Sequence, residues 1–232
     1  MIRACIFDLD GTILYTLDAI ALAGNRMLEE LGFPAQPVDD YRYYCGDGSD
    51  NLVRRCLKKV GGDTEDNLDA GYILNRKFLA EKPNYHVHPY EGMEQTLRTL
   101  KAQGIRIAVV SNKPDDSAQL TVHAQYGDLF DHVQGQGHGV PIKPDPTGAL
   151  RTAELLGVSP SECLYFGDTW TDMKTGRNAG MHTIGVLWGY RDRKELEENG
   201  AERIIEKPDE IPGPCEGELE LTQSHALRVG DA

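Results

Sequence analysis

The spacing of apolar positions divides the chain into two kinds of segment. Between residues 16 and 82, apolar side chains recur three, four or seven positions apart, which is the spacing of amphipathic helices. One pattern ends at Gly32, a second runs from Ser49, which we predict as its N-cap, to Gly61, and a third lies between residues 64 and 81. No strand pattern interrupts these segments. We therefore predict a purely helical block over residues 16–82.

On either side of this block, short apolar runs alternate with helical patterns. The runs predict strands at residues 2–7, 105–110, 130–134, 163–166, 183–187 and 203–205. The helical patterns predict helices at residues 93–103, 115–126, 146–156, 171–179 and 193–199. Because alternation of strand and helix is typical of parallel sheets, we expect an α/β fold with a doubly wound, mostly parallel sheet and a Rossmann-like core.

The helical block interrupts this α/β pattern and is therefore interpreted as an insertion. We expect a core domain of residues 1–15 and 83–213, with a small helical domain of residues 16–82 inserted into it. The last segment, residues 214–232, carries Pro, Gly, Glu and Ser with few apolar side chains. That composition predicts a flexible C-terminal tail.

Composition and charge narrow the class of protein. The chain has 232 residues, 40% hydrophobic and 26% charged, which is enough for one core with a small satellite domain. No apolar run is long enough to cross a bilayer and no room is left for a signal peptide, so we predict a cytoplasmic protein. A net charge of −13 argues against nucleic acid and anionic membranes as partners. The five scattered cysteines form no C-x-x-C pair and are interpreted as reduced packing residues, while monomer and homodimer both stay open.

Two carboxylates stand where the first predicted strand ends. Asp8 and Asp10 flank Leu9, and Gly11 breaks the apolar run. In open α/β sheets, ligands bind at the carboxyl ends of the strands. Two carboxylates this close repel each other unless a positive group, such as a divalent cation, lies between them. A turn or a loop calcium site is the alternative interpretation of the pair.

Polar side chains also follow three later segments of the predicted core. Ser111 and Asn112 end the second core strand, Asp168 and Asp172 follow a later one, and Lys143 precedes a helix in a proline-containing loop. Singly, Ser111 and Asp168 have an ordinary explanation as helix caps, and Lys143 as a surface lysine. Together, carboxylates, a hydroxyl and a lysine are the groups that bind and transfer a phosphoryl group.

The order of these segments resembles the motifs of the haloacid dehalogenase-like superfamily, over nearly the whole chain up to about Pro212. Its phosphatases carry Asp-x-Asp-Gly-Thr, then Ser-Asn, then Lys, then Gly-Asp-x-x-x-Asp, and the helical insertion resembles their cap domain. The segments that match the phosphoglycolate phosphatase-like subgroup best are Phe7-Asp8-Leu9-Asp10-Gly11-Thr12-Ile13-Leu14, Pro89-Tyr90-Glu91-Gly92 and Ser111-Asn112-Lys113-Pro114. The resemblance therefore implies a phosphatase acting on a small-molecule phosphate ester, phosphoglycolate or similar.

The resemblance also implies a role for each motif residue. Asp8 would be the nucleophile that forms an aspartyl-phosphate, and Asp10 the general acid and base. Mg²⁺ would be bound by Asp8, by the main-chain carbonyl of Asp10 and by Asp168, with Asp172 ligating directly or through water.

The remaining motif residues would bind the phosphate. Lys143 would offset the repulsion between the nucleophile and the phosphate, and Ser111 would hold phosphate oxygens. Thr12 and Asn112 would be supporting substrate contacts.

Other interpretations remain open at this stage. A sugar phosphomutase has the same cap and intermediate, but it returns the phosphoryl group to a sugar. A dehalogenase lacks the second aspartate, here Asp10. A phosphoacceptor signalling domain also uses carboxylates, a hydroxyl and a lysine, but its lysine comes last. In the cap, the loop from Gly46 to Asp50 is our candidate for the substrate contact, with Asp47 as the side chain to test. His86, His88 and His138 are expected to have ordinary surface or hydrogen-bonding roles.

Overall fold

The computed structural model describes residues 1–211, so the predicted tail of residues 214–232 lies outside the described residues. A six-stranded sheet has the order β5-β4-β1-β6-β7-β8, and every neighbouring pair is parallel. Its strands are β1 (Ala4–Phe7), β4 (Arg106–Pro114), β5 (His132–Gln136), β6 (Cys163–Gly167), β7 (His182–Val186) and β8 (Arg203–Ile205). The expected doubly wound α/β fold is confirmed.

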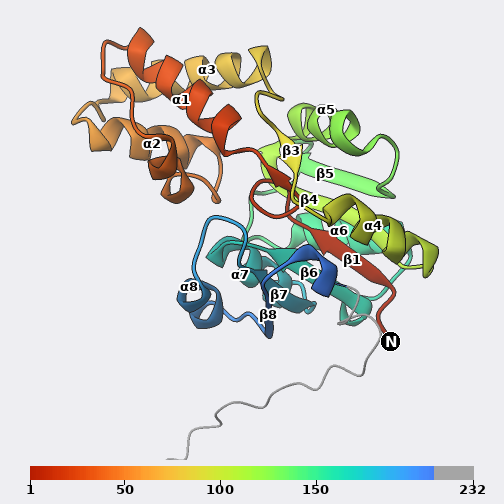
Figure 1. Ribbon diagram of the computed structural model, residues 1–232. Coiled ribbons are helices and arrows are strands. Elements are labelled where there is room, and N and C mark those ends of the chain that lie inside the picture. Colours follow the sequence, from red (N-terminus) through yellow and green to blue (C-terminus); the bar gives the residue numbers. More distant parts are fainter. Residues whose placement is uncertain (212–232) are drawn as a thin grey trace, which may run out of the picture.

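Helices cover both faces of this sheet, because successive side chains of each buried strand point to opposite faces. In β1, Cys5 and Phe7 enter a large apolar cluster, whereas Ala4 and Ile6 enter a second one. The first cluster packs against α4 (Met93–Ala102) and α5 (Asp115–Tyr126), and the second against α6 (Thr147–Leu156). The helices α7 (Trp170–Asn178) and α8 (Arg193–Glu198) complete the layers around β6 and β7 (Figure 1).

The predicted core elements agree with the structure except at their ends. The strand β4 continues to Pro114, beyond the predicted end at residue 110, because Pro114 still pairs with Gln136 of β5 after an irregularity in the register. Short 3₁₀ turns, η2 (Pro160–Glu162) and η3 (Pro208–Glu210), precede β6 and follow β8. The extension of β4 matters for function, because it places residues 111–114 at the carboxyl edge of the sheet.

The inserted block consists of helices around an apolar cluster of its own. It contains α1 (Leu17–Glu30), η1 (Val38–Tyr43), α2 (Ser49–Lys59) and α3 (Glu65–Glu81). Gly48, with φ 99°, is the N-cap of α2 and Ser49 is its first residue, so the prediction of Ser49 as N-cap is wrong by one position. The cluster includes Met27, Leu57 and Tyr41. The domain boundaries themselves, 1–15 with 83–213 and 16–82, stay a prediction.

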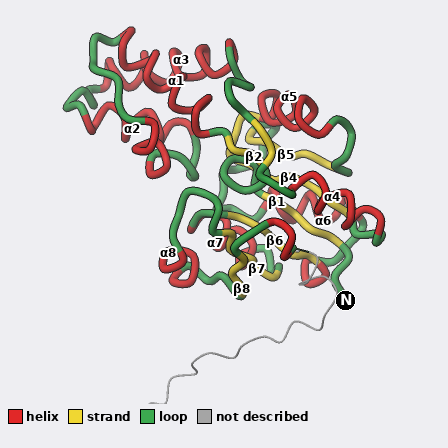
Figure 2. Tube along the Cα trace, viewed as in Figure 1, coloured by secondary structure: helices red, strands yellow, loops and turns green. Residues whose placement is uncertain are grey.

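A two-stranded antiparallel ribbon joins the block to the core. It pairs β2 (Leu14–Tyr15) with β3 (His88–Pro89), and Tyr15 stacks on His88 with ring centroids 5.1 Å apart. Figure 2 shows this ribbon beside the end of the sheet. The two passages of the chain between core and block are therefore tied together at one place.

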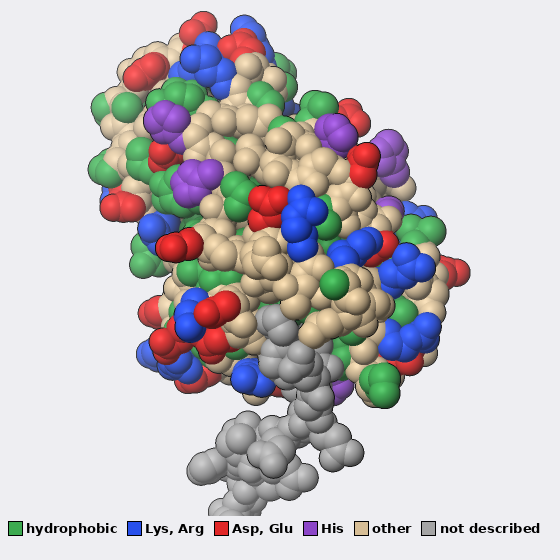
Figure 3. Space-filling view, turned by 45° about the vertical axis from the view of Figure 1, so that its right-hand side comes forward, with side chains coloured by type: hydrophobic (Ala, Val, Ile, Leu, Met, Phe, Trp, Pro, Cys, Tyr) green, Lys and Arg blue, Asp and Glu red, His purple; other side chains and the backbone are tan. Residues whose placement is uncertain are grey.

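The structure also bears on the expectations about membranes, cysteines and surface charge. In residues 1–211, no helix has the length and apolar character that crossing a membrane requires. The four cysteines within this range, Cys5, Cys45, Cys56 and Cys163, are buried, and no disulfide joins any two of them. On the face drawn in Figure 3, acidic and basic side chains are intermixed.

Candidate active site

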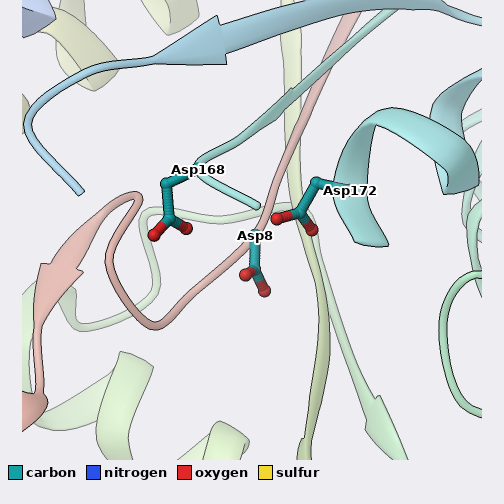
Figure 4. A group of neighbouring side chains, drawn as sticks. All are labelled: Asp8, Asp168 and Asp172. Atoms are coloured by element: carbon teal, nitrogen blue, oxygen red, sulfur yellow. The ribbon is translucent and has the colours of Figure 1, made fainter. Parts of the chain in front are cut away.

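Three buried carboxylates meet at the carboxyl edge of the sheet. Asp8 follows β1, Asp168 follows β6, and Asp172 lies in the first turn of α7. One oxygen of each lies within 4.8 Å of the others, and Figure 4 shows Asp8 between the other two side chains. The strands β1 and β6 are neighbours, and the chain winds outward from them in opposite directions. This is the switch point at which doubly wound sheets bind ligands.

Lys143 is the cation between these carboxylates. Its Nζ lies 2.7 Å from Asp8 Oδ1 and 2.7 Å from Asp172 Oδ1, and its side chain is 4% exposed. Asn112 holds the lysine's backbone, because Asn112 Oδ1 accepts from Lys143 N at 2.7 Å and Asn112 Nδ2 donates to Lys143 O at 3.3 Å. Its Nδ2 also donates to Gly46 O, so the Asn112 amide orients the lysine and contacts the inserted block.

Burial and mutual repulsion shift the pKa values of these groups. Burial raises the pKa of Asp8 well above its usual 3.8, the charges of Asp172 and Asp168 raise it further, and Lys143 opposes them. Burial and the Asp172 charge likewise raise the pKa of Asp168, to about 7. Burial alone would lower the pKa of Lys143, but Asp172 and Asp8 outweigh it and hold this pKa well above 10.5. The three-carboxylate cluster therefore contains more carboxyl groups than its one lysine can neutralise.

Asp168 is held from two sides by groups that orient its carboxylate. Thr12 Oγ1 donates to Asp168 Oδ1 at 3.0 Å, and the Tyr190 backbone N–H donates to Asp168 Oδ2 at 2.7 Å. Thr12 is fully buried and does not line the pocket described below. The Thr12 hydroxyl thus helps to position Asp168, and its expected role as a substrate contact stays a prediction.

Asp172 combines two contacts. Its Oδ2 accepts from the Thr169 hydroxyl at 2.7 Å and from the Thr169 N–H at 3.1 Å, as the partner in a capping box that begins α7. Its Oδ1 accepts from Lys143. The cap of this helix is Thr169, so the ordinary interpretation of Asp168 as a helix cap is wrong.

Asp10 makes a second ion pair, which the sequence interpretation missed. Lys113 Nζ lies 3.1 Å from Asp10 Oδ1, and the Lys113 side chain is only 2% exposed. The Lys113 N–H donates to Ser111 Oγ at 3.2 Å. In the sequence, Lys113 is part of the motif Ser111-Asn112-Lys113-Pro114, but no role was predicted for it. The signal that could have found it is its position at a strand's carboxyl end.

A pocket lies between these groups and the inserted block. Its core side is lined by Asp8, Asp10, Ser111, Asn112, Lys113, Pro114, Lys143 and Tyr190. Its other side is lined by Ile20, Ala23, Cys45, Gly46, Gly48, Ser49, Leu52, Asn75 and Leu79. The predicted catalytic residues Asp8, Asp10, Ser111 and Lys143 thus share one pocket. The start of α2, at Gly48 and Ser49, faces the same space.

The structure shows what Asp47, the side chain expected to contact the substrate, contacts in its place. Asp47 does not line the pocket, because its carboxylate makes a two-pronged ion pair with Arg55, at 2.6 Å for Oδ2, and its side chain is 13% exposed. The backbone of Gly46 and Gly48 borders the pocket instead. The parts of this loop that face the pocket are therefore the main chain of Gly46 and Gly48 and the residue Ser49.

A loop of the core reaches into the inserted block, and sequence reasoning missed it. The guanidinium of Arg191 donates to Cys45 O at 2.9 Å and to Arg42 O, and Arg42 Nη1 donates in turn to Gly189 O at 3.1 Å. Tyr190 packs within the apolar cluster of the block, and its hydroxyl lies 3.0 Å from that of Thr16. This loop follows β7, so the rule that strand ends carry function would have indicated it.

The three histidines lie outside this constellation. His86 lies 3.0 Å from Asp18 and His138 3.6 Å from Asp115, and both side chains are exposed. His88 contacts Pro89 O and Tyr15. Their expected ordinary roles agree with these contacts.

A divalent cation fits the three-carboxylate cluster. Asp8, Asp168 and Asp172 supply hard oxygen ligands, they are buried, and burial and repulsion raise the pKa of Asp8 and Asp168. A bound cation would offset that repulsion, and hard oxygen ligands suit Mg²⁺. Among the described residues, this is the group whose ligand atoms are close enough for metal binding.

Comparison with known proteins identifies the family. The family model for haloacid dehalogenase-like hydrolases matches residues 5–186. The phosphoglycolate phosphatase of Aquifex aeolicus (strain VF5) is 37% identical over 190 residues, covering 81% of this chain and 86% of that protein. The phosphoglycolate phosphatase of Thiobacillus denitrificans (strain ATCC 25259 / T1) is 31% identical over 229 residues, covering 96% and 97%.

A solved structure gives the same assignment. A protein from Lactobacillus delbrueckii subsp. bulgaricus ATCC BAA-365, whose name provisionally assigns it to the phosphoglycolate phosphatases, superposes with a TM-score of 0.89 at 28% identity. The match covers 93% of this chain and 99% of that one. The chain belongs to the haloacid dehalogenase-like hydrolases. Within them it is a phosphatase of the phosphoglycolate phosphatase-like group, as the motifs predicted.

Proposed function

We propose that this protein is a Mg²⁺-dependent phosphatase that hydrolyses phosphoglycolate or a similar small phosphomonoester through an aspartyl-phosphate on Asp8. The observation that supports this proposal most is the position of Asp8. Its carboxylate lines the pocket, lies 2.7 Å from Lys143 Nζ and belongs to the three-carboxylate cluster. A nucleophile needs this combination of access and nearby positive charge to approach an anionic phosphate.

In the first half of the reaction, a carboxylate oxygen of Asp8 attacks phosphorus and the bond from phosphorus to the ester oxygen breaks. Asp10 gives its proton to the departing alkoxide. In the second half, water attacks phosphorus, Asp10 takes the proton from that water, and the bond between phosphorus and Asp8 breaks. The products are the alcohol and inorganic phosphate. Both residues line the pocket, where a substrate could meet them.

Lys143 and Ser111 would bind the phosphate oxygens during these steps. Lys143 is oriented by Asn112 and by two carboxylates, so its ammonium group is fixed before substrate arrives. Asp8, Asp168 and Asp172, with the Asp10 carbonyl, would hold the cation. When bound, Mg²⁺ would supply positive charge at the phosphate oxygens. Thr12 and the Tyr190 N–H keep Asp168 in place for that role.

The substrate proposal comes from the relatives, which are named phosphoglycolate phosphatases. We further propose a cytoplasmic location and a monomeric or homodimeric state. The alternative function is a sugar phosphomutase, which would use the same Asp8 and Asp10 but transfer the phosphoryl group to a sugar hydroxyl. The two functions differ in one measurable quantity, the release of inorganic phosphate.

The test is phosphate release from phosphoglycolate and from p-nitrophenyl phosphate, with and without Mg²⁺, for wild type and Asp8→Asn. The matched control is Asp128→Asn, whose carboxylate is 97% exposed. We expect Asp8→Asn to abolish turnover, because an amide is a poor nucleophile, and the control to keep it. Substantial turnover by Asp8→Asn would refute the aspartyl-phosphate. Conversion of a sugar 1-phosphate to its 6-phosphate without phosphate release would favour the mutase.

A further inference from the structure

The two positive side chains that line the pocket are paired with different carboxylates. Two lysines line it, Lys143 and Lys113. Lys143 is paired with Asp172 and with Asp8, the residue proposed to attack phosphorus. Lys113 is engaged by Asp10, the residue proposed to protonate the leaving oxygen. Lys113 is therefore the cation beside the leaving group.

Lys113 has the capacity for a second anionic partner. An ammonium group has three donors, and the described side-chain ion pair to Asp10 accounts for one of them. Its side chain is 2% exposed, so water competes little for the other two. A charge-assisted hydrogen bond in such a site is stronger than the same bond in water.

The opposite wall of the pocket carries no charge but does offer polar groups. The inserted block contributes Asn75 of α3, which is 4% exposed, and no hydrogen-bond partner of its side chain is described within residues 1–211. The Asn75 side chain lines the pocket, so its amide donors and acceptor are available to a ligand or to water. The first residue of α2, Ser49, also lines the pocket, and the N-terminus of this helix favours negative charge.

We propose that Lys113 and Asn75 form a leaving-group subsite for one carboxylate, and that this subsite makes the enzyme selective for phosphate esters of short hydroxy acids. This inference rests on the proposed phosphatase function. The carboxylate of such a substrate is joined by one carbon to the ester oxygen that Asp10 protonates. It therefore lies within reach of the lysine paired with Asp10. A sugar leaving group would need several hydroxyl partners, whereas the other wall is mostly apolar, with Ile20, Leu52 and Leu79.

The experiment compares two substrates of nearly the same shape, phosphoglycolate and 2-hydroxyethyl phosphate. The second replaces the carboxylate with an uncharged alcohol. The readout is the ratio of their kcat/KM values, measured on one protein sample. That ratio does not depend on the fraction of folded protein, and it does not change if a variant alters Asp10 alone. The variants are Lys113→Met, Lys113→Arg and Asn75→Asp.

We expect wild type to prefer phosphoglycolate, and Lys113→Met to lower the ratio about 10- to 100-fold, the usual effect of losing one charge-assisted hydrogen bond. Lys113→Arg should retain most of the ratio because it keeps the charge. Asn75→Asp should lower it, since the new carboxylate repels the substrate carboxylate. An equal fall on both substrates in Lys113→Met would overturn the proposal, because the lysine would then act on Asp10 alone.

Two further outcomes separate this inference from the proposed function. A wild-type ratio near unity, with hydrolysis of 2-hydroxyethyl phosphate that depends on Asp8, would overturn the subsite and leave the phosphatase standing. Failure of wild type to hydrolyse any of these esters or p-nitrophenyl phosphate would overturn the proposed function, and the subsite with it.

Discussion

Arg191 joins the core to the inserted block by hydrogen bonds. We predict that removing its guanidinium destabilises the closed form of the pocket relative to an open form. The guanidinium is nearly buried, with 6% of the side chain exposed, and it donates to the carbonyls of Arg42 and Cys45. The adjoining residue Tyr190 donates its N–H to Asp168 and buries its ring in the block's apolar cluster. The substitution Arg191→Met keeps most of the apolar part of the arginine side chain. It removes the hydrogen bonds to the carbonyls of Arg42 and Cys45.

The magnitude follows from these two contacts. Each charge-assisted hydrogen bond contributes about 1.5–3 kcal/mol. Because the freed carbonyls regain water when the pocket opens, the lower end applies, and the pair stabilises the closed form by about 3 kcal/mol. A loss of that size shifts the equilibrium between closed and open forms about 150-fold. For a substrate that needs the closed pocket, kcat/KM should fall by up to about 150-fold, and the fall is smaller the more strongly wild type favours closure.

Two measurements test this prediction. The first is hydrogen exchange of the backbone amides in residues 42–48, which should become faster in Arg191→Met. The second is kcat/KM for phosphoglycolate and for p-nitrophenyl phosphate, of which the second should change less. The matched control is Arg193→Met, because Arg193 is 49% exposed and pairs with Glu197 and Glu206 of the core. If neither the hydrogen exchange of residues 42–48 nor kcat/KM changes, the inference that Arg191 stabilises the closed form of the pocket is refuted.

Two further predictions concern catalysis and stability. Asp10→Asn should lower kcat on phosphoglycolate about 10²- to 10⁴-fold, the usual contribution of general acid–base catalysis. The loss should be smaller on p-nitrophenyl phosphate, because its leaving group needs no proton. Equal losses of kcat on both substrates would contradict the assigned role of Asp10. Asp131→Asn should cost about 1 kcal/mol at pH 7, discounted for solvent, because Asp131 accepts from Lys101, Arg106 and the Ile107 N–H. Burial raises the pKa of Asp131, but these donors outweigh it and lower this pKa below 3.8, so its stabilising effect exists above about pH 4 and disappears as the pH falls through the lower folded value. Urea unfolding at pH 7 and pH 3 checks this, and a difference between the proteins that does not shrink at pH 3 would contradict it.

Strand and helix periodicity predicted the architecture of the core because both faces of its sheet are buried. A strand with helices on both sides needs a continuous apolar run, such as residues 163–166. The helices that cover the sheet need apolar residues three or four positions apart, on the side that packs against it. The prediction failed where other forces decide. The end of β4 at Pro114 depends on pairing with β5 after an irregularity in register, and the strands β2 and β3 have two residues each. Neither feature produces a periodic pattern of apolar residues that could be recognised in the sequence.

The site was predictable to the extent that its residues stand at strand ends. Asp8 and Asp168 follow neighbouring strands, so their meeting is a consequence of parallel order. What each side chain contacts was less predictable. Thr12 and Asn112 carry groups that could bind phosphate, and in the structure they contact Asp168 and the Lys143 backbone, while their roles toward a substrate stay predictions. Asp47 is turned to Arg55, eight residues along the chain, a pairing that depends on the fold of the loop before α2.

The two cations that sequence reasoning passed over explain how one pocket can be built from two separately packed parts. Lys113 lies just beyond the predicted end of its strand, and Arg191 lies in the loop after β7. Buried charges need partners: Lys113 pairs with Asp10 on the core side of the pocket, whereas Arg191 pairs with Glu195 of the core and also donates to carbonyls of residues 42 and 45 in the block. A boundary held by such polar contacts can open at a modest cost, whereas an apolar one of the same area would resist separation. Substrate entry and product release need that opening. The catalytic groups lie on the rigid sheet edge, whereas the boundary is held by the reversible hydrogen bonds of Arg191 together with the apolar contact of the Tyr190 ring.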